Sequence, residues 1–192
     1  VTGQTELFPE AETLSIAVAI AGNGEAWFDD VELFVVGDEP EAVNYVANGD
    51  MEDVAADRPG GWYLVVSEGD QGECSIETEN PHGGLRCLHL VGNAESCGAG
   101  SVQIPIAPGQ QYELTGFVRS TTGSGRLAIA YFKDGEFVGA TRGTASSSEA
   151  WEMQALTPEF EAFPEATHFT AVVMGTGEFE AWFDDLQIVA VE

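Results

Sequence analysis

The chain has 192 residues, of which 44% are hydrophobic and 23 are glycine, so it is long enough for a full core and too apolar for a disordered chain. Its 33 acidic residues against six basic ones give a net charge of −27, which repels nucleic acid and anionic membranes. No apolar run is long enough to span a membrane, so no membrane insertion is expected.

The acidic excess has two interpretations, which are compatible with each other. A solvated acidic surface of this kind is typical of proteins adapted to high salt, where dissolved cations screen the self-repulsion. Alternatively, some of the carboxylates hold Ca²⁺, because this hard cation prefers oxygen ligands.

The chain opens with two predicted strands, 14–20 and 26–36, around the turn Gly22-Asn23-Gly24, a pattern typical of a hairpin. Apolar residues lie on both of its faces, and a lone two-stranded unit of that kind is not stable in water. We therefore expect it to pair with further strands, either those of its own module or those of a neighbouring chain by strand addition.

Part of this opening segment is repeated near the C-terminus. The sequence Glu-Ala-Trp-Phe-Asp-Asp begins at Glu25 and again at Glu180, 155 residues later, and Phe-Pro-Glu-Ala repeats with the same offset. A constant offset without gaps indicates duplication of one structural unit. Residues 1–38 are therefore interpreted as the C-terminal strands of a preceding copy, with a linker from residue 37, and residues 43–192 as one complete module.

Strand follows strand through this module, with turn signals about every eight to twelve residues. In the strand that begins at Tyr112, Leu114 and Val118 share the inner face, while Phe117 and Arg119 share the other. The pattern predicts an all-β antiparallel β-sandwich, a jelly roll, whose core includes Leu88, Leu90, Tyr112, Leu114, Val118, Leu186 and Ile188. The predicted strands are 63–66, 73–78, 85–91, 101–106, 112–120, 126–133, 136–141, 152–157, 168–174 and 181–191.

Three cysteines, Cys74, Cys87 and Cys97, permit one disulfide and one further thiol. In a hairpin that turns at Pro81-His82-Gly83, Cys74 and the residues just before Cys97 are expected at the same end. Cys87 is expected near the turn and on the opposite face of its strand. We therefore predict a Cys74–Cys97 disulfide that ties down the loop 93–98, with Cys87 free; the alternative is that all three stay reduced.

A series of short motifs in the module resembles a known family. In chain order they are Asn48-Gly49-Asp50-Met51-Glu52, Gly60-Gly61-Trp62, Gly83-Gly84 before Cys87-Leu88, Tyr112-Glu113-Leu114-Thr115-Gly116-Phe117-Val118, Trp151 and Phe183-Asp184-Asp185-Leu186. Their order is similar to that of the jelly-roll carbohydrate-binding modules of the CBM4/9/22 type, here in tandem repeat. The resemblance implies a β-sandwich that is either a sugar binder or a purely structural repeat, because this fold hosts both.

The resemblance also implies a structural Ca²⁺ where the first strand of the module meets the last. The matching ligands are the carboxylates of Glu52 and Asp185 and backbone oxygens near Asp50 and Gly84. Oxygen ligands from distant segments suit calcium, and an ion that clamps both ends of the module stabilises the sandwich. The alternative is that Asp184 and Asp185 cap a strand or form an exposed acidic pair.

Aromatic side chains are the candidates for sugar binding, because a pyranose ring offers an apolar face for stacking while its hydroxyls need polar partners. Phe117 is the most informative, since it lies opposite the core set and beside Arg119. Tyr112 and Trp182 are expected to be buried instead. The predicted ligand-binding residues are Trp62, Tyr63, Phe117, Arg119, Tyr131 and Phe132.

No convergent catalytic site is found, because His82, His89 and His168 lack a neighbouring nucleophile pattern, and we therefore expect no enzyme. The predicted function is that of a non-catalytic carbohydrate-binding-like module in a secreted or cell-surface tandem-repeat protein. Its expected partners are a polysaccharide or glycan and neighbouring modules or other copies of the chain. The alternative is a structural subunit of an extracellular fibre or surface layer that assembles by strand addition without a sugar ligand.

Overall fold

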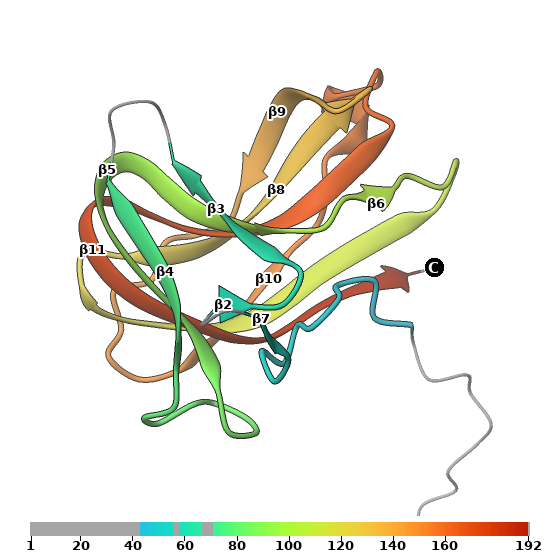
Figure 1. Cartoon of the computed structure of the whole chain (residues 1–192). Helices are drawn as coiled ribbons and strands as arrows, with labels where there is room; N and C mark the ends of the chain where they lie inside the picture. The colour runs from blue at the N-terminus through green and yellow to red at the C-terminus, as the bar shows by residue number, and fades with distance from the viewer. Residues whose placement is uncertain (1–42, 56–57, 67–70, 192) are drawn as a thin grey trace, which may run out of the picture. The chain divides into compact units, whose positions relative to one another are not determined.

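The computed structural model describes residues 43–55, 58–66 and 71–191, which belong to one compact unit. The predicted hairpin over residues 14–36 and the linker lie outside the described residues. The elements are β1 (Val54–Ala55), β2 (Arg58–Pro59), β3 (Trp62–Val66), β4 (Gly72–Glu77), β5 (Cys87–Ser101), β6 (Ile104–Pro105), β7 (Gln111–Thr122), β8 (Gly125–Lys133), β9 (Glu136–Arg142), β10 (Glu152–Leu156), η1 (Phe160–Ala162) and β11 (His168–Val191) (Figure 1).

Two long strands, β5 and β11, organise the fold. β11 pairs with β8 through its first part, 168–175, and with β7 through its last part, 180–191. β5 in turn pairs with β4 through residues 87–92 and with β3 through residues 97–101. Each long strand therefore belongs to two layers, and both appear as long curved ribbons in Figure 1.

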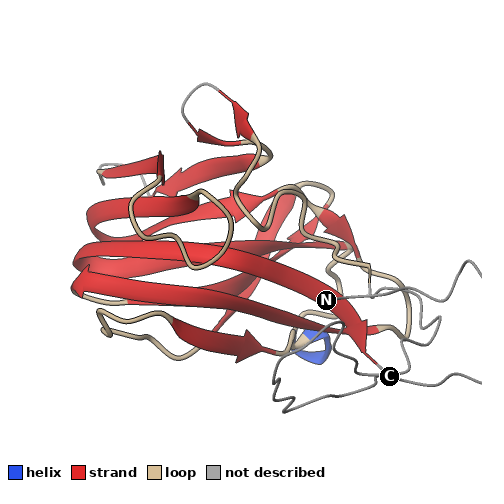
Figure 2. Cartoon of the chain, turned by 90° about the horizontal axis from the view of Figure 1, so that it is seen from below, coloured by secondary structure: helices blue, strands red, loops and turns tan. Residues whose placement is uncertain are grey.

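The strand pairings give two large antiparallel sheets, besides the short antiparallel pair of β1 and β2. Sheet A has the order β9–β8–β11–β5–β3 and uses the first part of β11 with the second part of β5. Sheet B has the order β10–β7–β11–β5–β4 and uses the remaining parts of the two long strands. The predicted antiparallel β-sandwich is confirmed, and the only helix of the described residues is the three-residue η1, blue in Figure 2.

The core lies between the two sheets and follows from the alternation of side chains along each strand. In β7 every second side chain from Tyr112 to Ser120 is buried. Leu127, Ile129 and Tyr131 of β8 oppose them from sheet A, within the same apolar cluster. All seven predicted core residues are at most 2% exposed, and a fully buried side chain of this size contributes about 1.5–3 kcal/mol.

The structure corrects the prediction at β5 and β11. The strands predicted at 168–174 and 181–191 form one strand, because the glycine-containing segment between them is extended rather than a turn. The register shifts between Gly175 and Gly177, an irregularity of the kind that bends a strand from one sheet into the next. Residues 93–98, predicted as a loop, are likewise part of β5.

The first described residues close the module by lying along its last strand. The side chain of Asn44 donates to the carbonyl oxygen of Leu186 and accepts from the amide of Ile188, both at 3.0 Å. The amide of Leu186 donates to the carbonyl oxygen of Gly49 at 2.8 Å. A Cβ atom at Gly49 would overlap the carbonyl oxygen of Leu186, so the close approach of the two chains requires glycine at this point of the motif.

Candidate functional site

The outer face of sheet A is hollowed into a groove with a volume of about 530 Å³. Four strands, β5, β8, β9 and β11, form its floor with the side that points away from the core. Small residues occupy most of this floor, namely Gly98, Gly100, Ala128, Ala130 and Ala140, while β11 contributes Thr170, Val172 and Met174. The groove therefore gains its depth from missing side chains, since longer ones at these positions would fill it.

Exposed aromatic and aliphatic side chains form the walls of the groove. On the β3 side, the large hydrophobic side chains of Tyr63 and Val65 are 43% and 46% exposed. On the other side, Phe132 of β8 meets Phe137 of β9 edge to face, with ring centroids 6.0 Å apart, and Phe137 is 61% exposed. Exposed apolar side chains that face each other across a hollow are typical of a binding groove.

Thr170 of β11 adds a polar group to the floor. Its side chain is 2% exposed, and its hydroxyl has no hydrogen-bond partner among the described residues. A buried hydroxyl without a partner costs free energy. Its position beneath the groove is therefore not explained by the stability of the fold.

Two of the predicted binding residues, Tyr63 and Phe132, line the groove, and two others, Trp62 and Tyr131, lie in the core. Trp62 is 6% and Tyr131 is 0% exposed. Tyr131 accepts from the amide of Glu159 at 2.7 Å. Consecutive residues of a strand point to opposite faces of the sheet. Only one residue of the neighbours Trp62 and Tyr63, and only one of Tyr131 and Phe132, can therefore reach the groove.

The remaining predicted binding residues, Phe117 and Arg119, lie on the outer face of sheet B, which we call the covered face. The imidazole ring of His82 stacks on Phe117, with centroids 3.4 Å apart. The guanidinium of Arg119 lies 4.1 Å from the ring centroid of Trp182 and 5.3 Å from that of Trp151. Both side chains are therefore engaged by aromatic neighbours of the chain itself.

The covered face is closed by the loop 78–86. Trp151 donates through Nε1 to the carbonyl oxygen of Asn80 at 3.2 Å, and the carboxylate of Asp184 accepts from the amides of His82 and Gly83 at 2.9 and 3.0 Å. Burial raises the pKa of Asp184 to about 6, against the opposing effect of these amides. Trp182, predicted to be buried, is 8% exposed.

The predicted calcium ligands Glu52 and Asp185 contact the second half of this loop, where Gly84 also lies against Glu52. The carboxylate of Glu52 accepts hydrogen bonds from the backbone amides of Leu85 and Arg86 at 2.6 and 3.0 Å. These hydrogen bonds, chiefly the one from Leu85, lower the pKa of the Glu52 carboxyl group. The guanidinium of Arg86 lies 3.1 Å from Oε2 of Glu52, and Asp185 contacts Nδ1 of His82 at 2.7 Å.

This donor set is a poor fit for the implied calcium. The described residues contain no group of three or more His, Cys, Asp or Glu side chains placed to hold a metal ion. Asp50 shares a small hollow with Asp185, but the carboxylate of Glu52 is satisfied by N–H donors. A calcium ion at Glu52 would have to displace the guanidinium of Arg86. Calcium binding at this point therefore stays a prediction from the family resemblance.

The structure does not contain the predicted Cys74–Cys97 disulfide, because Cys74 is a free thiol. Cys74 and Cys97 belong to the same apolar cluster, where burial raises the pKa of Cys74 to about 11. Cys74 therefore packs as a small protonated apolar group. Cys87 is also a free thiol, and burial raises its pKa to about 12.

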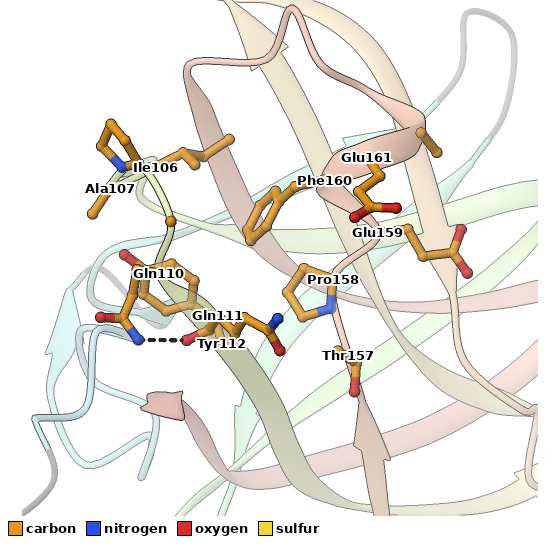
Figure 3. Close-up of a pocket in the computed structure, with 13 residues that line it drawn as sticks. Ile106, Ala107, Gln110, Gln111, Tyr112, Thr157, Pro158, Glu159, Phe160 and Glu161 are labelled. Atoms are coloured by element: carbon orange, nitrogen blue, oxygen red, sulfur yellow. Dashed lines mark hydrogen bonds between the residues drawn. The ribbon is translucent and has the colours of Figure 1, made fainter. Parts of the chain in front are cut away.

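A second hollow, of about 610 Å³, lies at one end of the sandwich (Figure 3). It is lined by the turn that precedes β7 and by residues 157–162. Of its two aromatic rings, Tyr112 belongs to the core cluster and Phe160 packs against it. The exposed residues Glu159 and Glu161 lie at its rim. It offers no exposed aromatic platform, which makes the groove the better candidate.

Several groove residues were not predicted, namely Val65, Gln103, Phe137, Arg142 and Thr170. A signal existed for Phe137, because the turn Asp134-Gly135 predicts a hairpin in which Phe137 lies opposite Phe132. The others require the strand order of sheet A, which no local pattern contains. No helix of the described residues is long and apolar enough to cross a membrane.

No family model and no curated protein matches the sequence. The chain is similar to the CBM22-1 xylan-binding domain from Paenibacillus barcinonensis Xyn10C, with a TM-score of 0.59 and 13% identity over 79% of this chain and 98% of that one. It is also similar to the family 11 carbohydrate-binding module of the cellulosomal cellulase Lic26A-Cel5E of Clostridium thermocellum, with a TM-score of 0.55 and 11% identity over 79% and 96% of the two chains.

A third similar structure is the enzymatically active domain of tailspike protein 4 of bacteriophage CBA120, with a TM-score of 0.57 and 14% identity over 77% of this chain. This chain covers only 21% of the tailspike domain. At such identities the likeness shows the fold alone. The predicted resemblance to jelly-roll carbohydrate-binding modules is confirmed at that level.

Proposed function

We propose that the module is a non-catalytic polysaccharide-binding domain and that the groove on sheet A is its binding site. The observation that carries the proposal is the pair of exposed aromatic walls, Tyr63 and Phe137, on either side of a floor of small residues. The apolar face of a pyranose ring can stack on such a wall, and the hydroxyls of the sugar can remain in water at the open side.

The apolar floor supplies the driving force and the aromatic walls supply orientation. Transfer of apolar surface out of water contributes about 25 cal/mol per Å², and this term applies to the ring faces of a sugar as it does to side chains. The similar structures named above include a xylan-binding domain, and a related module of TM-score 0.51 was solved with β-1,4-galactotriose. These names support a polysaccharide as the class of ligand.

We further infer that the module is one copy in a tandem array of a secreted or cell-surface protein. The support is the repeat with a constant offset of 155 residues, together with the large acidic excess and a ligand class that is found outside the cell. An array of weak binding modules would gain affinity for a long polymer by multivalency.

Affinity electrophoresis and calorimetry of the whole chain against a panel of soluble plant and microbial polysaccharides test the proposal. We expect at least one polysaccharide to bind, and Tyr63→Ala to weaken that binding about tenfold, which corresponds to about 1.4 kcal/mol. Tyr45→Ala is the matched control, because Tyr45 is 38% exposed and Tyr63 43%, while Tyr45 lies outside the groove. No binding across the panel, or equal losses in the two variants, would overturn the proposal.

A further inference from the structure

The charge of the groove differs from that of the rest of the chain. The sequence contains 33 acidic residues, yet none of the described residues that line the groove is Asp or Glu. Among these described residues one is charged, and it is a cation, Arg142, at the end of β9. This inversion of sign is local, because the net charge of the chain is −27.

Arg142 has no partner among the residues that the structure describes. Its side chain is exposed and makes no hydrogen bond or ion pair with any described residue, although acidic residues are abundant. Other arginines are engaged: Arg86 pairs with Glu52 at 3.1 Å, and Arg119 lies 4.1 Å from the ring centroid of Trp182. The guanidinium of Arg142 is therefore available to a bound molecule.

The combination of an available arginine and no carboxylate points to an acidic group on the ligand. For a neutral sugar, Asp and Glu would be useful acceptors of hydroxyl hydrogen bonds, and the chain has many of them. For a ligand that carries a carboxylate, acidic lining residues would repel it, whereas a guanidinium can bind it with two parallel charge-assisted hydrogen bonds.

The overall charge limits how acidic the ligand can be. A continuous polyanion would be repelled by the net charge of −27, because the summed field of a protein acts on a ligand of like sign. A single acidic group experiences mainly the charges within about 8 Å at physiological ionic strength. The floor and walls, which are apolar, require neutral ring faces.

We propose that the groove binds a polysaccharide with a neutral backbone and isolated uronic-acid side groups, whose carboxylate pairs with Arg142. This inference rests on the proposed function, since it names the ligand class of the same groove. In this arrangement Tyr63 and the floor bind backbone rings, while Arg142 selects the acidic substituent.

Calorimetry of the whole chain with two uronate-bearing polysaccharides, glucuronoxylan and gum arabic, tests the proposal when each is compared with the same polymer after chemical reduction of its carboxyl groups. We expect reduction to weaken binding of at least one of them about tenfold, and Arg142→Gln to remove that difference. The difference should also shrink from 50 mM to 500 mM salt, because a surface ion pair is screened.

Arg58→Gln is the matched control, since Arg58 is another exposed arginine and its removal changes the net charge equally. If the reduced polymers bind as well as the native ones, if both arginine variants have the same effect, or if only neutral polysaccharides or continuous polyuronates such as polygalacturonate bind, the inference is wrong and the proposed function stands. Failure to bind any polysaccharide, acidic or neutral, contradicts the proposed function itself.

Discussion

The two outer faces of the sandwich carry aromatic residues in similar number but use them in different ways. On the groove face, Tyr63 and Phe137 stand apart over a floor of glycine and alanine and remain 43% and 61% exposed. On the covered face, Trp182 is 8% exposed, and Phe117 lies beneath His82. One face keeps its apolar surface open, and the other has enclosed it.

Side-chain alternation along a strand therefore decides which face of the sheet a residue takes, but not whether that face is open. Both faces are equivalent in the periodicity of their strands. On the covered face the loop 78–86 is fastened to the sheet through Asp184 and Trp151. No loop among the described residues is fastened across the groove in this way. Function is therefore expected where packing is incomplete.

The largest effect should come from the stack on the covered face. Trp182 lies between His89, 4.7 Å away by ring centroids, and the guanidinium of Arg119. We expect Trp182→Ala to lower the free energy of unfolding by about 3 kcal/mol, because a large buried aromatic is replaced by a cavity. Urea unfolding measures this change.

Polysaccharide binding provides the control for Trp182→Ala. Below the unfolding midpoint the variant should bind like the parent chain, since Trp182 does not reach the groove. A variant of normal stability that has lost binding would reverse the roles assigned to the two faces.

Phe137 and Phe117 lie on opposite outer faces of the sandwich, so the same substitution at each tests the comparison of the two faces directly. Phe137→Ala should weaken polysaccharide binding about five- to tenfold, or about 1–1.4 kcal/mol, with little change in stability because its ring is exposed. Phe117→Ala should lower the free energy of unfolding by about 1–2 kcal/mol, because it removes a stacked partner of His82, and it should leave binding unchanged. Calorimetry and urea unfolding of both variants decide the matter, and a loss of binding in Phe117→Ala would restore the covered face as a candidate site.

The sequence was informative about the core and less so about the site. The alternation in β7 placed Tyr112 inside and Phe117 outside, and both placements are correct. It could not show that His82 covers Phe117, because that contact joins segments far apart in the chain. The small residues of β8, Ala128 and Ala130, indicate a poor sugar site when taken alone, whereas in sheet A they provide the depth of the groove.

Glu52 and Asp185, which contact the loop of the covered face, allow a test of calcium binding. If the calcium that the family resemblance implies displaces Arg86 from Glu52 and binds there, a chelator at fixed ionic strength should lower the free energy of unfolding by about 1.4 kcal/mol at free calcium roughly tenfold above its dissociation constant. Asp185→Ala should remove this sensitivity, and polysaccharide binding at the groove should not change. Identical melting with and without chelator would leave Arg86 as the cation that neutralises Glu52.

The smallest expected effect concerns the floor of the groove. Thr170 is 2% exposed, and its hydroxyl lacks a hydrogen-bond partner among the described residues, so Thr170→Val replaces a costly buried polar group by a methyl of similar size. We expect the free energy of unfolding to rise by about 1 kcal/mol.

Thr141→Val is the matched control, because Thr141 is 8% exposed and its hydroxyl is hydrogen-bonded to that of Tyr131 at 2.9 Å. This substitution should lower the free energy of unfolding by about 1 kcal/mol. Thermal unfolding of the two variants separates them by sign, and a destabilising Thr170→Val would show that this hydroxyl serves the fold. If Thr170→Val instead stabilises the chain and weakens polysaccharide binding, the hydroxyl is retained for the ligand, and the incomplete packing of the groove face is part of its function.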